Sequence, residues 1–253
     1  MALIPEGRQW YNAMQITWEK RYSHGVAMTA NYTYSQAWEE VDPLNQGEPR
    51  HKQHTGSHRP HVVRLTGTWD MPKLLDQNAW VRGFAGGWSL GTVATFRRGT
   101  LVAMPGNVDV IGDYTLTDGN RGRWFNTCTL GVDGVTRNAC ADPGVDERAA
   151  DPGRAPLQPA FQLRPNNARD TTGARLEGVY RSSPPNVDIN FIKTIKLSGR
   201  VNAQIRVELY NMMGAVLFPN PDTGTANFAT FGTVATNQSN DPRFVMLNFR
   251  VSY

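Results

Sequence analysis

The chain has 253 residues, of which 40% are hydrophobic and 19% charged, and its formal net charge is +4 at pH 7. These values exclude an intrinsically disordered chain, which combines low hydrophobicity with a high net charge. They also give no support for a nucleic-acid partner, because the basic residues are scattered and form no dense run. No stretch approaches about 18 consecutive apolar residues, which excludes a transmembrane helix. A membrane-spanning β-barrel is not excluded, because its strands alternate in polarity.

The N-terminal sequence MALIPEGRQW contains no basic region followed by an apolar stretch. It therefore predicts no secretory signal peptide. Two interpretations follow: either the protein stays in the cytoplasm, or the sequence is a piece of a longer chain.

The first two expected strands span residues 9–22 and 26–39, and both alternate strictly in polarity. Between them, His24 and Gly25 predict a two-residue turn. Strands of about 12 residues are long for a soluble protein, where about five or six is usual, but they suit a tilted crossing of a bilayer. The apolar face of the first strand carries Trp10, Met14, Ile16, Trp18 and Tyr22.

Five further strands are expected over residues 61–70, 87–104, 187–196, 200–211 and 243–253. The connections alternate in length: 24–25 and 197–200 are tight, 71–86 is intermediate, and 40–60, 105–186 and 212–242 are long. Short periplasmic turns and long extracellular loops are typical of outer-membrane barrels. The prediction is therefore an all-β, antiparallel transmembrane β-barrel portion with about seven long strands and long extracellular loops. Such a chain would end in the periplasm.

Aromatic residues lie near the ends of the expected strands, as Trp10, Trp69, Trp88 and Tyr253 show. In a barrel they would form the two girdles at the membrane interfaces. The alternative is that they are core residues of a soluble β-sandwich, which would bury the apolar stripes instead of exposing them to lipid.

The C-terminal sequence RFVMLNFRVSY resembles the assembly signal of bacterial outer-membrane proteins, in which a terminal aromatic follows apolar residues at every second position. The matching residues are Val245, Leu247, Phe249, Val251 and Tyr253. The resemblance implies capture of this strand by the barrel-assembly machinery, through main-chain hydrogen bonds and pockets for alternate side chains.

Residues 186–253 resemble the end of the barrel of TonB-dependent outer-membrane receptors, in the Oar-like subgroup, whose members often carry a carboxypeptidase-regulatory-like domain. Upstream, GGWSLGTVATFRRGT and RPHVVRLTGTWDMP resemble earlier strands of the same barrel. Departures are Tyr210, where the family usually has Phe, and Met212 to Gly214. The matching positions are Asn186, Asp188, Lys193, Lys196, Arg206, Glu208, Tyr210, Asn211, Phe218 and Pro219.

The resemblance implies a barrel of about 22 strands with a plug inside. Residues 1–253 would be its C-terminal part, without the plug or the signal peptide, and would not function alone. It also implies energised uptake of a small ligand, either an iron chelate, cobalamin or an oligosaccharide. TonB would act through the missing plug, and the loops 40–60, 105–186 and 212–242 would bind the ligand.

Four histidines fall in one expected loop, at His51, His54, His58 and His61. Imidazole is the commonest metal ligand, so this spacing raises the hypothesis of an extracellular Zn, Cu, Ni or Fe site. No Cys or closely spaced carboxylate completes a familiar zinc pattern. We therefore expect a solvated polar loop and no metal or cofactor.

Cys128 and Cys140 are the two cysteines of the chain, and both lie in the longest expected loop. In an extracellular segment they favour a disulfide, worth on the order of 3 kcal/mol for a loop of this size. Free thiols are the alternative.

Asp188, Arg206 and Glu208 fall on the polar faces of their strands. In a barrel they would line the lumen, where a plug contacts them. We expect no enzyme, because no nucleophile elbow, HExxH motif or phosphate-binding loop occurs. The alternative function is a soluble secreted β-sandwich that acts in adhesion or glycan binding.

Overall fold

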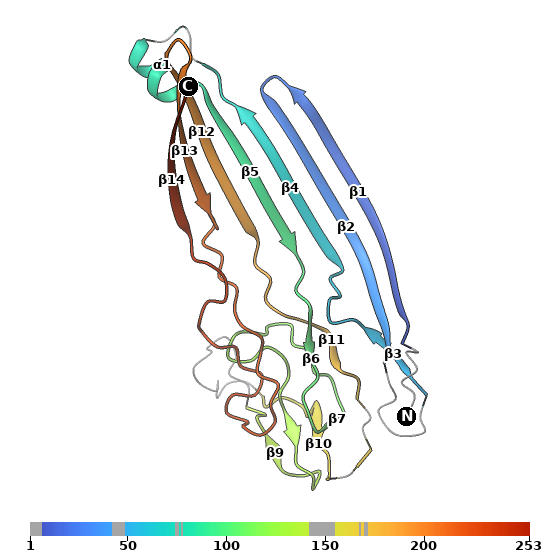
Figure 1. Cartoon of the computed structure of the whole chain (residues 1–253). Coiled ribbons are helices and arrows are strands. Elements are labelled where there is room, and N and C mark those ends of the chain that lie inside the picture. Colours follow the sequence, from blue (N-terminus) through green and yellow to red (C-terminus); the bar gives the residue numbers. More distant parts are fainter. Residues whose placement is uncertain are drawn as a thin grey trace.

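The computed structural model describes residues 7–41, 49–73, 76, 78–141, 155–166, 168–169 and 172–253. Over these residues the fold is all-β apart from one short helix, and the long strands are antiparallel, which confirms the predicted fold class (Figure 1). Within the same ranges, no helix is both long and apolar enough to cross a membrane.

One large sheet holds seven long strands side by side, in chain order, and its outer edges are β1 and β14 (Figure 1). The short strand β3 (His51–His54) pairs with β2 within the segment expected to be a loop. The sheet is open in the described part of the chain. The long strands are β1 (Gln9–Ser23), β2 (Val26–Val41), β4 (His61–Asp70), β5 (Trp88–Arg97), β12 (Asn186–Ser198), β13 (Val201–Tyr210) and β14 (Phe244–Ser252).

The strand register places the apolar stripes of neighbouring strands on one face of this sheet. Trp18 lies opposite Ala30, Ala30 opposite Leu65, Leu65 opposite Ala94, and Ala94 opposite Val187. Because side chains alternate along a strand, these five residues form one row across β1, β2, β4, β5 and β12. We call this surface the apolar face.

The neighbouring row lies on the opposite surface, which we call the polar face. It runs through Thr17, Asn31, Arg64, Thr95 and Asn186. The single-residue offset between the two rows therefore separates apolar from polar side chains across the sheet. This is the pattern of a barrel wall with lipid outside and water inside.

The same division continues to the C-terminal edge of the sheet. Phe191, Val207 and Leu247 form an apolar row, and Ile192, Arg206 and Asn248 form the adjacent row on the polar face. The side chain of Leu247 is 74% exposed, and that of Ile16 in β1 is 53% exposed. A soluble β-sandwich would bury these side chains against a second sheet, so the structure does not favour that alternative.

The turn between β1 and β2 follows the sequence prediction. His24 and Gly25 have φ values of 52° and 77°, as both central residues of a tight hairpin turn require. A Cβ atom at Gly25 would lie 2.7 Å from the carbonyl oxygen of Asp70, so only glycine fits there. This turn, the β12–β13 turn and the C-terminus lie at the same end of the sheet (Figure 1).

The helix α1 (Ala79–Ala85) lies at that end too, in the link between β4 and β5. The side chain of Asn78 caps it by accepting a hydrogen bond from the amide of Val81, at 2.9 Å. Lys193 is buried on the apolar face, where its ammonium group donates to the carbonyls of Gly83 and Gly86. The helix C-terminus thus supplies partners to a charge that otherwise points toward the apolar side.

The predicted fourth strand, 87–104, is too long. Strand β5 ends at Arg97, and β6 (Leu101–Ala103) joins a different sheet by pairing with β11 (Arg175–Tyr180). The chain changes direction around Gly99, where a Cβ atom would lie 2.0 Å from the carbonyl oxygen of Arg181. Close backbone approach at this glycine therefore separates the two strands.

The described residues of the segments 105–186 and 212–242, expected to be loops, fold together with Leu101–Ala103 into a layer that we call the loop cap. It contains the short strands β7 (Val108–Val110), β8 (Thr129–Leu130), β9 (Arg137–Asn138) and β10 (Phe161–Leu163), besides β6 and β11. The loop cap lies at the end of the sheet opposite the tight turns (Figure 1).

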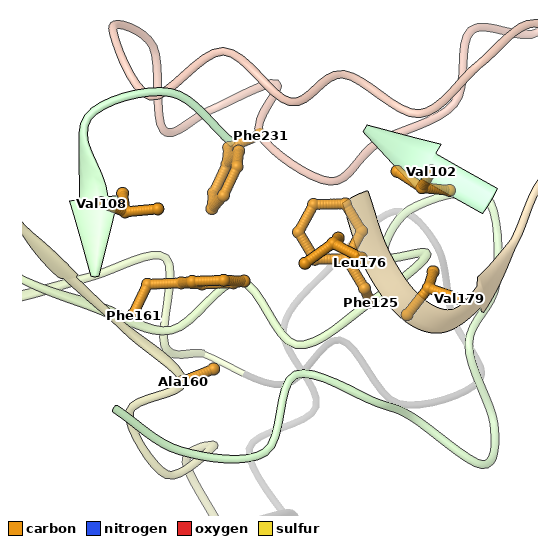
Figure 2. Close-up of a cluster of buried hydrophobic side chains, with 8 residues drawn as sticks. All are labelled: Val102, Val108, Phe125, Ala160, Phe161, Leu176, Val179 and Phe231. Carbon is orange, nitrogen blue, oxygen red and sulfur yellow. The ribbon is translucent and has the colours of Figure 1, made fainter. Parts of the chain in front are cut away.

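The loop cap has its own hydrophobic core (Figure 2). Phe125, Phe161 and Phe231 are each at most 3% exposed. Their rings meet edge to face, with centroids 5.4–6.2 Å apart. Phe231 comes from the 212–242 segment, so burial of its ring joins two segments that are distant in sequence. The remaining core residues are Val102, Val108, Ala160, Leu176 and Val179.

Candidate functional site

The polar face and the loop cap together form the candidate functional site, because both present polar groups on the side away from lipid. Of the residues predicted to line the lumen, Arg206 and Glu208 lie in β13 and form an ion pair at 3.5 Å. Glu208 also accepts hydrogen bonds from Tyr210 and Asn248. These charges therefore have partners within the sheet, and the hydrogen bond from Asn248 to Glu208 links β14 to β13.

Asp188, the third of these residues, closes the loop-side end of the sheet. One carboxylate oxygen accepts a hydrogen bond from the backbone amide of Asn211 at 2.9 Å, and the other accepts one from the side chain of Asn186 at 3.2 Å. Asn211 has a φ of 46° and is 5% exposed. Its side-chain amide forms hydrogen bonds with the backbone of Ala215 and Asp241, and so fixes both ends of the 212–242 segment.

Cys128 and Cys140 form a disulfide, and the two Cα atoms are 4.1 Å apart. Cys128 precedes β8, and Cys140 follows β9, so the bond closes the antiparallel β8–β9 hairpin. Both side chains are buried in the loop cap. The cross-link restricts the unfolded conformations of a segment whose strands contain only two residues each.

Replacing both cysteines with serine is expected to destabilise the hairpin by about 2–3 kcal/mol. Limited proteolysis should then cleave the segment 129–139 faster than in the parent protein, while the long strands stay protected. Adding reductant to the parent protein should reproduce the faster cleavage. Adding it to the double variant should change nothing. Equal cleavage of the parent protein and the double variant would contradict this account.

The four histidines do not converge on one point. Both ring nitrogens of His54 have partners, Glu177 at 2.6 Å and Gln36 at 3.1 Å. The Nδ1 atom of His58 accepts the amide hydrogen of Ala37 at 3.4 Å. His61 lies 2.9 Å from the hydroxyl of Tyr32. The buried Nε2 atom of His51 has no hydrogen-bond partner. Across the described ranges, no group of three or more His, Cys, Asp or Glu is arranged to hold a metal ion.

Histidine stacking adds to the backbone pairing that joins β3 to β2. The ring of His54 lies between Trp38 and His58, with centroid distances of 3.6 and 4.0 Å. Burial, and then the neighbouring His54, lower the pKa of His58 below its ordinary value of 6.5. The folded state therefore favours the neutral ring.

Acidification is expected to loosen this stack. Because the pKa of His58 is lower in the folded state, the unfolded chain takes up the proton first as the pH falls below about 6.5. The stabilisation present at neutral pH is then lost as the pH falls further. Hydrogen exchange at the Ala37 amide should become severalfold faster, relative to its intrinsic rate, between pH 7.5 and pH 5.

The variant His58→Gln should remove this pH dependence, whereas His24→Gln, at the exposed β1–β2 turn, should retain it. A pH dependence that persists in His58→Gln would show that another group is responsible.

Four arginines that no sequence motif singles out lie where the polar face meets the loop cap. Arg64 and Arg97 lie on the polar face of β4 and β5, and Arg59 and Arg181 lie in the adjoining segments. Three cavities of about 490, 500 and 400 Å³ lie in this region. Only their positions in the sequence could have indicated these arginines, because each lies at or near the end of a strand.

The long amphipathic strands, the exposed apolar face and the folded loop cap define an integral β-sheet membrane protein. The chain belongs to the family described as the outer membrane beta barrel domain, whose match covers residues 2–246. It is therefore an integral β-barrel protein of the bacterial outer membrane, as the sequence predicted. No curated protein and no solved structure matches the chain.

Proposed function

We propose that the chain is the C-terminal part of the barrel of a TonB-dependent receptor of the Oar-like subgroup, and that it takes part in active ligand uptake. The observation that carries this proposal is the loop cap, a folded layer with its own core at one end of a polar sheet face. A folded layer can present a ligand-binding surface of fixed shape, because its side chains are held by packing.

The resemblance in residues 186–253 supports the same proposal. The structure gives a physical role to four of the shared positions, since Asp188 holds the start of the 212–242 segment through Asn211, and Glu208 pairs with Arg206. A complete receptor of about 22 strands would add further strands to the open edges at β1 and β14. The plug inside it would contact the polar face and receive energy from TonB.

The proposed ligand is an iron chelate, cobalamin or an oligosaccharide. Capture of β14 by the barrel-assembly machinery is proposed as well. Support comes from the position of β14 at a sheet edge, with Val245, Leu247 and Phe249 on its exposed apolar side. An edge strand with free main-chain groups is suited to pairing with another strand.

We propose transport in preference to catalysis. The charged groups of the polar face at Asp188, Arg206 and Glu208 are held in hydrogen bonds and an ion pair within the sheet. Groups held in this way stabilise the sheet that forms the barrel wall, whereas a catalytic acid or base must reach a reacting atom.

The test measures uptake in cells that express the complete gene containing this sequence, with and without TonB. Radiolabelled ferric chelates, cobalamin and oligosaccharides are supplied separately. The proposal expects accumulation of one of these ligands that requires both the gene and TonB. Accumulation that requires the gene but not TonB would identify a passive pore and would overturn the proposal. The proposal would also be overturned if the gene increased the accumulation of none of the supplied ligands.

A further inference from the structure

Four arginines gather where the polar face meets the loop cap. Arg64 and Arg97 project from the polar face of neighbouring strands, because Arg64 lies opposite Thr95 and Arg97 opposite Val62. Arg59 precedes β4, and Arg181 follows β11. We call these four residues the arginine cluster.

Three neighbouring cavities are lined by the residues of the arginine cluster. Arg59 and Arg64 line the cavity of about 490 Å³, and Arg64 and Arg97 line the cavity of about 500 Å³. The cavity of about 400 Å³ is lined by Arg59, Arg97 and Arg181 together. Each cavity thus shares an arginine with the next, and a molecule in the cavity of about 400 Å³ lies beside three of the four arginines.

Within the described residues, the arginine cluster lacks the ion pairs that other arginines form. No ion pair involves any of its four residues, whereas Arg164 pairs with Asp109 at 3.0 Å and Arg175 with Glu39 at 3.4 Å elsewhere in the structure. Arg59 donates a hydrogen bond to the backbone carbonyl of Arg98 at 3.2 Å.

Arg181 adds an independent observation. Its Nε atom is buried and has no hydrogen-bond partner. A buried donor without a partner is unfavourable and needs an explanation, and a water molecule or ion that binds there is one. The backbone amide of Arg181 donates a hydrogen bond to the carbonyl of Thr100 at 2.8 Å, and the residue lines the cavity of about 400 Å³.

The positive charges also affect one another. Burial, followed by the charges of Arg97 and Arg181, lowers the pKa of Arg59. Mutual repulsion of this kind is relieved when an anion enters between the charges.

We propose that the arginine cluster binds an anionic solute bearing carboxylate or phosphate groups in the cavities beneath the loop cap. Guanidinium groups suit these anions, because their planar donors form paired, charge-assisted hydrogen bonds to two oxygens at once. The inference rests on the proposed uptake function and narrows its ligand to a multiply charged anion.

The phosphate of a lipid headgroup has the same chemistry, but its position is different. Arg64 and Arg97 lie on the polar face, opposite the exposed apolar side chains that contact lipid. The arrangement therefore favours a solute that enters from the water-filled side.

The test uses the protein assembled in the outer membrane and purified in detergent, with citrate as the anionic probe and calorimetry as the readout. Citrate should bind at low salt, and its affinity should fall as the salt concentration rises. Arg97→Gln should weaken binding about tenfold, and Arg97→Gln with Arg181→Gln should abolish it. The matched control is Arg250→Gln, which removes a charge from the polar face of β14 opposite Gln204. Heat-modified migration of each variant on gels verifies that it is folded.

Equal citrate binding by the parent protein and the double variant would overturn the proposal, and so would equal weakening by Arg250→Gln. Absence of citrate binding by the folded parent protein would overturn it as well. Loss of co-purified lipopolysaccharide from the double variant, with citrate binding unchanged, would assign the cluster to a lipid headgroup instead. TonB-dependent uptake is measured separately, so it can persist when this inference fails.

Discussion

Replacing Leu65 with arginine is expected to lower the free energy of unfolding in a bilayer by up to about 4 kcal/mol. Leu65 lies near the middle of β4 on the apolar face, between Ala30 and Ala94. A guanidinium at this depth must either lose its hydration or draw water into the hydrocarbon region. The measurement is a denaturant titration of the protein in lipid vesicles, with unfolding followed by tryptophan fluorescence.

The matched control is Thr66→Arg. Thr66 is the next residue of the same strand and lies on the polar face, between Thr29 and Val93. Its arginine would project into the water-filled side, so a change of less than about 1 kcal/mol is expected. Similar losses in the two variants would contradict the division of the sheet into lipid-facing and water-facing sides.

Replacing Phe161 with alanine is expected to destabilise the loop cap by about 3–5 kcal/mol. The ring of Phe161 has no exposed surface and contacts those of Phe125 and Phe231 edge to face (Figure 2). Its removal leaves a cavity in the core that joins the two long segments. Hydrogen exchange should show faster opening throughout the loop cap, while the long strands of the sheet keep their protection.

Phe228→Ala is the control for this prediction. Phe228 is only partly buried at the border of the same core, where its ring meets that of Phe231. The expected loss is therefore much smaller, about 1 kcal/mol. If exchange in the long strands accelerates as much as exchange in the loop cap, the two layers unfold together and the account of a separate core is wrong.

The sequence predicts the large sheet well because the period of two is a strong local signal. Residues such as Trp18 and Leu65 alternate with polar neighbours over a whole strand, and the register then places them in one row. His24 and Gly25 locate the first turn, since their positive φ values suit few other residue pairs. The predicted fourth strand runs too far because Leu101–Ala103 is apolar and does form a strand, β6, whereas the break before it depends on contact of Gly99 with a distant segment.

The loop cap was not predictable from local patterns. Its strands contain two to six residues, which is too short for periodicity to appear. Its stability depends on side chains such as Phe125 and Phe231, which meet only after the chain has returned to the same end of the sheet. The arginine cluster was missed for the same reason, because Arg59, Arg97 and Arg181 are brought together by strand pairing.

The most direct test of the account is the depth of single labelled cysteines in vesicles that contain brominated lipid. Cys128 and Cys140 are bonded to each other, so Leu247→Cys or Asn248→Cys would add the one free thiol of residues 1–253. A fluorophore at position 247 should be strongly quenched by the bromine atoms, whereas one at position 248 should not. Equal quenching at the two positions, or none at either, would contradict the lipid-facing role of the apolar face.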